Sequence, residues 1–124
     1  MSKLFEPIRI GAVTVPNRLV KSAMGEALAD EHGRPTPDLL QLYRAWARGG
    51  TGLLITGMMT IRAGHAFTGR ELGLHEDGAV GPLSQLTREV HREGGTIFAQ
   101  LCHAPPQLPR AACRRLGPVA PSAG

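Results

Sequence analysis

Thr96-Ile97-Phe98-Ala99-Gln100-Leu101-Cys102-His103 is the stretch that decides the fold of this 124-residue chain. Its apolar residues have the pattern of a buried strand, and the strand ends by placing an amide, a thiol and an imidazole together. Residues 19–24 (LVKSAM) and 51–57 (TGLLITG) read the same way, each as an apolar run bounded by turn or helix-start signals. Near-continuous apolar strands are typical of parallel sheets whose faces are covered by helices.

Two helices are predicted between these strands. The first begins at 36–38 (TPD), which supplies an N-cap, a proline at the first helical position and an early acid. It ends at 49–50 (GG), because glycine readily adopts the left-handed conformation that follows a helix. The second helix begins at Pro82 and ends in the same way at 94–95 (GG).

Apolar residues recur at helical spacing in both predicted helices, so each helix is expected to pack one face on the sheet. These residues are Leu39, Leu42, Tyr43 and Trp46 in the first helix and Leu83, Leu86 and Val90 in the second. We interpret Tyr43 and Trp46 as residues of the core or its rim and not as ligand contacts, because burial alone accounts for aromatic residues at this spacing.

Two more segments complete the prediction. A β-hairpin is expected near the start, where Ile8, Ile10, Val13 and Val15 alternate around the two-residue loop Gly11-Ala12. Residues 60–78 carry many charged and histidine side chains without a sustained period, so they are predicted to form a long loop. Long loops in compact domains are often functional.

The predicted order is hairpin, strand, helix, strand, helix, strand, which indicates an α/β fold with right-handed crossovers between parallel strands. A dinucleotide-binding fold shares this order, but 22–26 (SAMGE) stands where its Gly-x-Gly-x-x-Gly loop would follow the first strand. We therefore expect residues 1–124 to form one partial domain, the first three β/α repeats of a TIM (β/α)₈ barrel preceded by the hairpin. A whole barrel takes about 250 residues, so the prediction is a truncated barrel.

Composition and cysteine usage narrow the class of protein. Hydrophobic residues make up 42% of the chain, yet no apolar run approaches the roughly 20 residues of a membrane span. Residues 1–7 lack the apolar core of a signal peptide, so a cytoplasmic location without membrane contact is expected. Cys102 and Cys113 are too few for a disulfide framework, and together with His103 they match no common zinc spacing, so no metal site is predicted.

The net charge of +4 is concentrated near the C-terminal end. Residues 1–93 hold eleven basic and ten acidic side chains, whereas 94–124 hold Arg110, Arg114 and Arg115 and no acid. A basic cluster of this kind can bind phosphate or nucleic acid. The cluster has no aromatic residue on which a base would stack, so nucleic-acid binding is not expected and a solvated surface is the simpler reading.

Four segments, considered in order and at their spacing, carry a family resemblance. They are 4–11 (LFEPIRIG) with 16–20 (PNRLV), then 49–56 (GGTGLLIT), 100–104 (QLCHA) and 117–123 (GPVAPSA). Together they resemble the Old Yellow Enzyme family of flavin-dependent oxidoreductases, also called the NADH:flavin oxidoreductase family. The first segment is similar to the hairpin that caps the family's barrel floor, and the third to the Gln-Leu-x-His-x segment that ends its third strand.

The resemblance implies a (β/α)₈ barrel that holds FMN at the C-terminal ends of its strands. In the family, NADH or NADPH reduces the flavin, which passes hydride to an electron-poor alkene or a related small-molecule acceptor. By position, the implied cofactor contacts are Ser22, Ala23, Met24 and Gly25 after strand one, Met58 on strand two and Gln100 on strand three. No catalytic residue is carried over, because the family's substrate-binding pair, proton-donating tyrosine and phosphate clamp lie in later repeats.

The chemistry of Gln100 fits this role, because a carboxamide offers a donor and an acceptor and the pyrimidine edge of a flavin displays both kinds of group. The alternative is an amide that satisfies neighbouring strand ends. For Met24 and Met58 the alternative is packing in the core. Gly25 either lets the backbone approach a planar ring or serves a turn after the strand.

Two places depart from the family's pattern, and one histidine is excluded from the family's catalytic residues. Gly25 stands where many relatives have a Cys or Thr that contacts the flavin and tunes its potential. Residues 105–107 (PPQ) replace the usual Gly-Arg, which removes two backbone donors and stiffens the loop. His103 is not the family's substrate histidine, because it belongs to a different strand.

Three functions remain open from the sequence. The first is the N-terminal part of an FMN-dependent oxidoreductase, which needs the remaining repeats for activity. The second is a non-catalytic remnant or interaction module, and the third is a weak phosphate or nucleic-acid binder that uses the basic cluster. Under any of them, open strand edges and an uncovered apolar face are expected to cause self-association.

Overall fold

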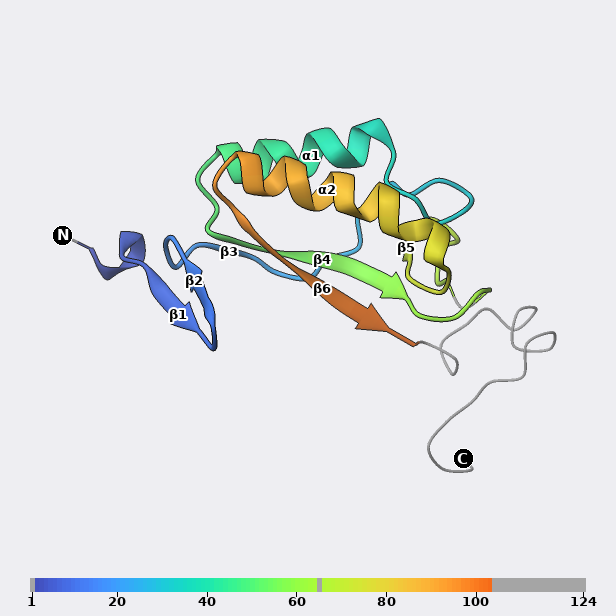
Figure 1. The fold of residues 1–124 in the computed structure, drawn as a ribbon, viewed down its shortest axis with the longest axis horizontal. Helices are drawn as coiled ribbons and strands as arrows, with labels where there is room; N and C mark the ends of the chain where they lie inside the picture. The colour runs from blue at the N-terminus through green and yellow to red at the C-terminus, as the bar shows by residue number, and fades with distance from the viewer. Residues whose placement is uncertain (1, 65, 104–124) are drawn as a thin grey trace, which may run out of the picture.

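The computed structural model describes residues 2–64 and 66–103 and shows a parallel sheet with α1 and α2 packed on one face (Figure 1). The elements of this part of the chain are η1 (Lys3–Phe5), β1 (Ile8–Ile10), β2 (Val13–Val15), β3 (Val20–Lys21), α1 (Pro37–Arg48), β4 (Leu53–Thr60), β5 (Leu72–Gly73), η2 (Asp77–Ala79), α2 (Val80–Arg92) and β6 (Thr96–Cys102). This α/β arrangement with an N-terminal hairpin confirms the predicted order of elements.

The predicted hairpin is formed by β1 and β2, which pair antiparallel with Ile8 opposite Val15 and Ile10 opposite Val13. Gly11 adopts a φ of 58° in the connecting turn, a conformation that favours glycine. The hairpin stands beyond the N-terminal ends of the parallel strands (Figure 1). It is therefore remote from the end of the sheet where sites on this kind of fold are expected.

Strand β4 is the centre of the parallel sheet. It pairs with β3 through Leu53 and with β5 through Met59, and β6 runs along its whole length. Because Leu53 and Met59 also pair with β6, strands β3 and β5 both lie on the edge of β4 opposite β6. One apolar run of the sequence thus forms the central strand, and the other two supply its neighbours β3 and β6.

The expected strand over 19–24 is too long: only Val20–Lys21 pairs with β4. The chain leaves the ladder at Ser22 and passes close over Gly57 of β4, where an added Cβ would lie 2.8 Å from the carbonyl oxygen of Met24. The expected strand over 51–57 is also corrected, because β4 begins at Leu53 and continues to Thr60. The third strand begins at Thr96 as predicted.

The capping signals of α1 are confirmed. The Thr36 hydroxyl accepts a hydrogen bond from the backbone N–H of Leu39 at 3.3 Å and donates one to the carbonyl of Leu28 at 2.6 Å. Gly50 adopts a φ of 90° after the last turn. Helix α2 begins at Val80, earlier than the predicted Pro82. Pro82 thus lies in the first turn, which tolerates a proline because the backbone N–H groups there have no intrahelical partner.

The core lies between the helices and the sheet. Its buried members are Ala29, Leu39, Tyr43, Ala47, Leu54, Met59, Leu72, Leu86 and Val90. Tyr43 is fully buried and Trp46 packs on it edge-on at the rim, with 5.2 Å between the ring centroids. The prediction that Tyr43 and Trp46 belong to the core or its rim is therefore confirmed.

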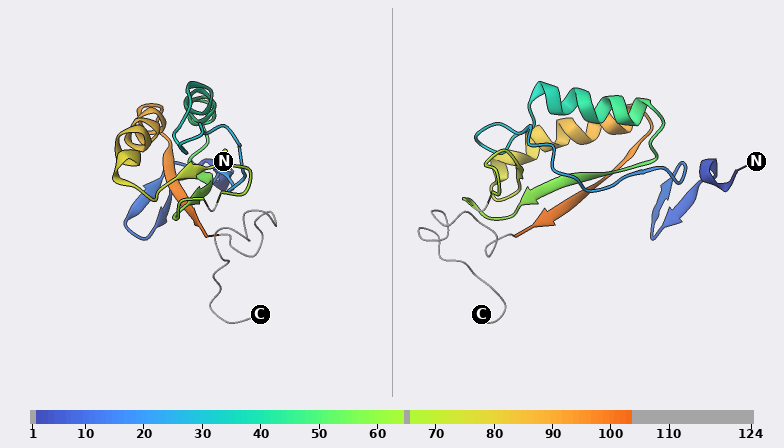
Figure 2. Two further views of the ribbon diagram at one scale, coloured as in Figure 1. Left: turned by 90° about the vertical axis from the view of Figure 1, so that its right-hand side faces the viewer. Right: turned by 180° about the vertical axis from the view of Figure 1, so that it is seen from behind.

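The opposite face of the sheet carries no helix within residues 2–64 and 66–103, as the two views of Figure 2 show. Large apolar side chains remain exposed on the strands and just after them: Val20 is 53% exposed, Met24 62% and Leu101 64%. In this part of the chain no helix is long and apolar enough to cross a membrane.

The loop predicted over 60–78 contains more order than expected. Its residues Leu72–Gly73 form β5 and Asp77–Ala79 form η2, so the segment returns to the sheet before α2 begins. Glu71 is buried and accepts hydrogen bonds from the backbone N–H and hydroxyl of Thr68 at 2.8 and 2.9 Å. The carboxylate thus closes the turn that leads into β5. A local hydrogen-bond pattern of this kind leaves no periodic signal in the sequence, so β5 is not predicted from it.

Candidate functional site

Four of the six predicted cofactor contacts, namely Met24, Gly25, Met58 and Gln100, lie together over the C-terminal half of β4. Met58 of β4 and Gln100 of β6 are register partners, so they occupy neighbouring positions on the sheet. Gly25 and Met58 line the same small cavity beside β5. The segment Ser22, Ala23, Met24 and Gly25 follows β3 and is exposed along its length.

A β-bulge in β4 sets the position of Gln100. The register shifts between Ile55 and Met58, so β4 has one residue more than β6 across this interval. The hydroxyl oxygen of the buried Thr56 accepts the backbone N–H of Gln100 at 2.9 Å. The Gln100 side chain is exposed, and its carboxamide makes no hydrogen bond to the described part of the chain.

The two methionines differ in burial. Met24 is 62% exposed, so it is not a core residue in this structure. Met58 is half-buried and lies at the edge of the core, where it lines the cavity that it shares with Gly25. An added Cβ at Gly25 would meet no atom within 4 Å, which leaves the space over this backbone open.

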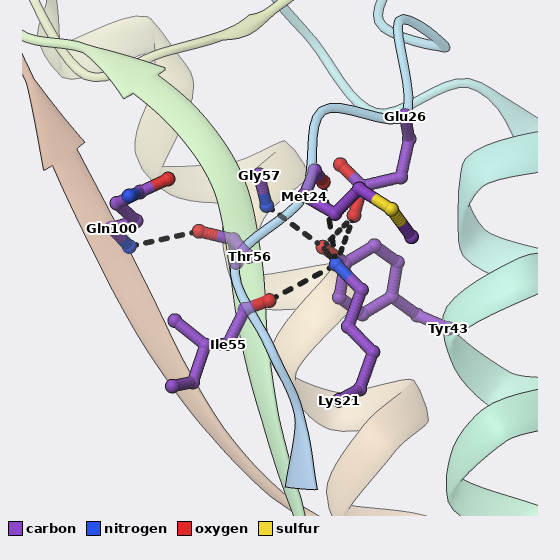
Figure 3. A network of polar contacts seen from close by, with 8 residues as sticks. All are labelled: Lys21, Met24, Glu26, Tyr43, Ile55, Thr56, Gly57 and Gln100. Atoms are coloured by element: carbon purple, nitrogen blue, oxygen red, sulfur yellow. Dashed lines mark hydrogen bonds and ion pairs between the residues drawn. The ribbon is translucent and has the colours of Figure 1, made fainter.

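A buried charged network lies directly behind this segment, and the sequence reasoning missed it. Lys21 forms an ion pair with Glu26, and each side chain is only 9% exposed. The Lys21 ammonium also donates to the carbonyl of Ile55 at 3.0 Å and to the carbonyl of Met24 at 3.5 Å. Figure 3 shows these groups converging between β4 and α1.

Tyr43 connects the network to helix α1. Its hydroxyl donates to Glu26 at 2.7 Å and accepts from the Lys21 ammonium at 3.4 Å and from the backbone N–H of Gly57 at 3.3 Å. Burial, reinforced by the hydrogen bond to Glu26, raises the pKa of Tyr43 far above its ordinary value. Tyr43 therefore stays protonated and keeps donating to the carboxylate at physiological pH.

Aromatic rings complete the environment of the Lys21 ammonium. The nitrogen lies 5.2 Å from the ring centroid of Tyr43 and 4.9 Å from that of Trp46. Both distances are within the range of cation–π attraction, which compensates part of the hydration that the ammonium loses. One sequence signal could have identified this network, namely a lysine inside an apolar strand followed five residues later by an acid.

Several predicted features lie outside the described residues. They are Cys113 of the rejected metal set, the basic cluster Arg110, Arg114 and Arg115, the Pro-Pro-Gln stretch at 105–107 and the family-like stretch at 117–123. Cys102 is half-buried at the end of β6. Within residues 2–64 and 66–103, no three His, Cys, Asp or Glu side chains are grouped so as to hold a metal ion.

Comparison with known proteins places the chain in a family. The NADH:flavin oxidoreductase / NADH oxidase family matches residues 3–123. An NADH oxidase of Thermoanaerobacter brockii is 35% identical over 120 residues, and an NADPH dehydrogenase of Bacillus subtilis is 34% identical over 103 residues. The structure of an Old Yellow Enzyme homologue from Zymomonas mobilis superposes with a TM-score of 0.82 at 32% identity.

The match spans only the N-terminal part of these relatives. It includes 96% of this chain but 18% of the Thermoanaerobacter oxidase, and 82% of this chain but 30% of the Bacillus dehydrogenase. For the Zymomonas structure the corresponding shares are 99% and 34%. The parallel sheet, its helices and the hairpin thus match the N-terminal part of a TIM barrel, and the chain belongs to the NADH:flavin oxidoreductase family, also known as the Old Yellow Enzyme family.

Proposed function

We propose that this chain supplies the N-terminal, cofactor-facing part of an FMN-dependent oxidoreductase of the Old Yellow Enzyme type. When bound, FMN supplies hydride transfer from NADH or NADPH to an electron-poor alkene or a related small-molecule acceptor. The family uses FMN and NAD(P)H, and the chain matches the first part of its members. The reaction requires completion of the barrel by further β/α repeats, because a barrel of this class closes with eight, whereas FMN binding is proposed for the surface of this chain itself.

The observation that carries the proposal is the placement of Gln100 beside Met58 and of Met58 beside Gly25 of the segment 22–25. These residues come from β6, β4 and the end of β3, which are distant in sequence and adjacent in the sheet. Cofactor sites of barrels are built from the C-terminal ends of several strands. The arrangement supports a site at this edge and not at the hairpin end.

The residues present fit a flavin in their chemistry. An exposed carboxamide with both hydrogen-bonding functions matches the paired donors and acceptors of a pyrimidine edge. The open space over Gly25 admits a planar ring close to the backbone, and exposed Met24 offers a polarisable apolar contact. In the proposal, Gln100 orients the ring system, while Met24 and Met58 exclude water from its face.

Titration of the 124-residue chain with FMN tests the proposal. We expect saturable quenching of flavin fluorescence and a shift of the visible absorbance bands. Gln100→Ala is expected to weaken binding by about tenfold, the loss of about 1.4 kcal/mol of hydrogen bonding. Gln85→Ala is the matched control, because Gln85 is exposed on α2. Absence of binding by the unaltered chain would contradict the proposal for this chain.

A second candidate function is that of an interaction module without chemistry of its own. The exposed apolar residues Val20 and Leu101, on strands at opposite edges of β4, favour it. This function and the first give different results in the titration, because an interaction module that has lost the chemistry would leave the flavin spectrum unchanged. Phosphate or nucleic-acid binding by Arg110, Arg114 and Arg115 stays a prediction.

A further inference from the structure

We infer that Lys21, Glu26 and Tyr43 are positioning residues that fix the backbone of segment 22–25 in the conformation that faces the cofactor. The inference rests on the proposed flavin role of that segment. It adds a function for a charged network whose Lys21 and Glu26 side chains are each only 9% exposed.

The contacts of Lys21 show how the segment is held. Lys21 lies immediately before the segment and Glu26 immediately after it, so their ion pair closes the segment into a loop. Within that loop the ammonium donates to the carbonyl of Met24 at 3.5 Å. The same ammonium donates to the carbonyl of Ile55 at 3.0 Å, which ties the loop to β4.

The contacts of Tyr43 fix the loop against a second element. The Tyr43 hydroxyl donates to Glu26 at one end of the loop and accepts the backbone N–H of Gly57 in β4. Gly57 also permits the close approach, since an added Cβ would lie 3.1 Å from the Cα of Gly25. Helix α1, strand β4 and the loop are therefore joined through one hydroxyl.

Stability alone does not account for this network. Removing an ammonium and a carboxylate from water carries a large desolvation cost, and apolar residues of similar volume often replace such pairs without loss of stability. The network does have one specific geometric consequence, because its hydrogen bonds end on the backbone of the loop and of the bulged part of β4. Hydrogen bonds from rigid elements are an effective means of holding a binding surface in one geometry.

The double substitution Lys21→Met with Glu26→Leu separates positioning from stability, because it removes both charges together and keeps the volume apolar. We expect the double variant to remain folded, with a cooperative urea transition, although the buried Tyr43 hydroxyl loses its Glu26 acceptor. We expect FMN, titrated by fluorescence quenching, to bind about tenfold more weakly, with altered visible bands of the bound flavin. Arg44→Gln with Glu93→Gln is the control, since it removes an exposed ion pair of 3.0 Å on the helical face.

A readout without flavin tests the loop itself. In the unaltered chain, amide ¹⁵N relaxation is expected to give order parameters of about 0.85 for Ala23, Met24 and Gly25. In the double variant the same order parameters are expected to fall below about 0.6. The order parameters of β6 amides, such as that of Ile97, are expected to be the same in both proteins. Order parameters that remain high in the double variant would overturn the inference, whatever the flavin titration shows.

The two proposals fail in different ways. If the unaltered chain binds FMN and the double variant binds it equally well, the positioning inference is overturned and the proposed function stands. If the unaltered chain does not bind FMN, the proposed function is overturned for this chain, and the positioning of the loop toward a cofactor is overturned with it. Weakened binding together with lowered order parameters in a stable variant supports both.

Discussion

The side-chain oxygen of Thr56 accepts the backbone N–H of Gln100 at 2.9 Å, so a hydroxyl of β4 replaces a carbonyl in the ladder between two parallel strands. This happens at the bulge, where the β4 carbonyls are out of register with β6. The bond has a consequence for the proposed site. It fixes the backbone of the residue whose carboxamide is expected to meet the cofactor.

Thr56→Val tests this relationship, because valine keeps the shape of threonine and removes the acceptor. We expect the free energy of unfolding to fall by about 1 kcal/mol, the contribution of one hydrogen bond that is not replaced. Urea unfolding measures the change, with Thr56→Ser as the variant that retains the hydroxyl. Equal losses in both variants would show that packing, and not the bond to Gln100, is responsible.

Gly57→Ala is expected to disturb the proposed site through sterics alone. The added Cβ would lie 2.8 Å from the carbonyl oxygen of Met24 and 3.1 Å from the Cα of Gly25, so backbone must move. Overpacking of this kind costs about 1–3 kcal/mol. Thermal and urea unfolding measure the loss, and Gly81→Ala is the control because its Cβ would meet nothing within 4 Å. A Gly57 variant as stable as the control would contradict the close approach.

Tyr43 gives a pH dependence whose sign follows from its raised pKa. Its ordinary pKa is 10.0, and burial together with Glu26 keeps the phenol protonated in the folded chain above that pH. Above about pH 10 the unfolded chain then binds fewer protons than the folded chain. The contribution of Tyr43 to the free energy of unfolding is therefore constant below that pH and falls above it by about 1.4 kcal/mol per pH unit. Tyr43→Phe abolishes this one contribution.

We therefore expect the difference in free energy of unfolding between the unaltered chain and Tyr43→Phe to narrow as the pH rises from about 9 to about 11. Urea unfolding at several pH values, carried out on both proteins in parallel, measures the difference and cancels other groups that titrate in this range. A difference that stays constant with pH would show that Tyr43 ionises alike in the folded and unfolded chains.

The N-cap of α1 is expected to carry measurable stability. Thr36→Ala removes the acceptor for the Leu39 N–H and the donor to the Leu28 carbonyl, and we expect a loss of about 1–2 kcal/mol. Thr36→Ser retains both functions and is expected to lose less than half of that amount. Urea unfolding of the two variants decides whether the hydroxyl or the methyl group of Thr36 matters.

Self-association through the uncovered sheet face is a further prediction. Val20 is 53% exposed on β3, where its partner Leu53 lies on the sheet face opposite the core residue Leu54, and we expect sedimentation to show oligomers of the isolated chain whose proportion falls in Val20→Lys. Leu74→Lys is the control, because Leu74 is exposed in the loop after β5. A sharp monomeric species that unfolds cooperatively would contradict this prediction.

Local sequence signals were sufficient for most of the secondary structure. The alternation around Gly11, the Thr36-Pro37 start of α1 and the apolar run at Thr96 each specify an element through interactions within a few residues. The errors lie where long-range contacts decide. β3 is short because segment 22–25 leaves the sheet to cross Gly57, and β5 exists because Glu71 closes a turn that presents two residues to Met59 and Thr60.

The sequence by itself determined the α/β order and the family, because periodicity, caps and motifs are local properties of the chain. Only the tertiary structure placed Gln100 beside Met58, revealed the bulge at Thr56 and brought Lys21, Glu26 and Tyr43 together. The physical reason is that a buried charge depends on partners from other elements for its compensation. Its environment exists only after strand, loop and helix have packed.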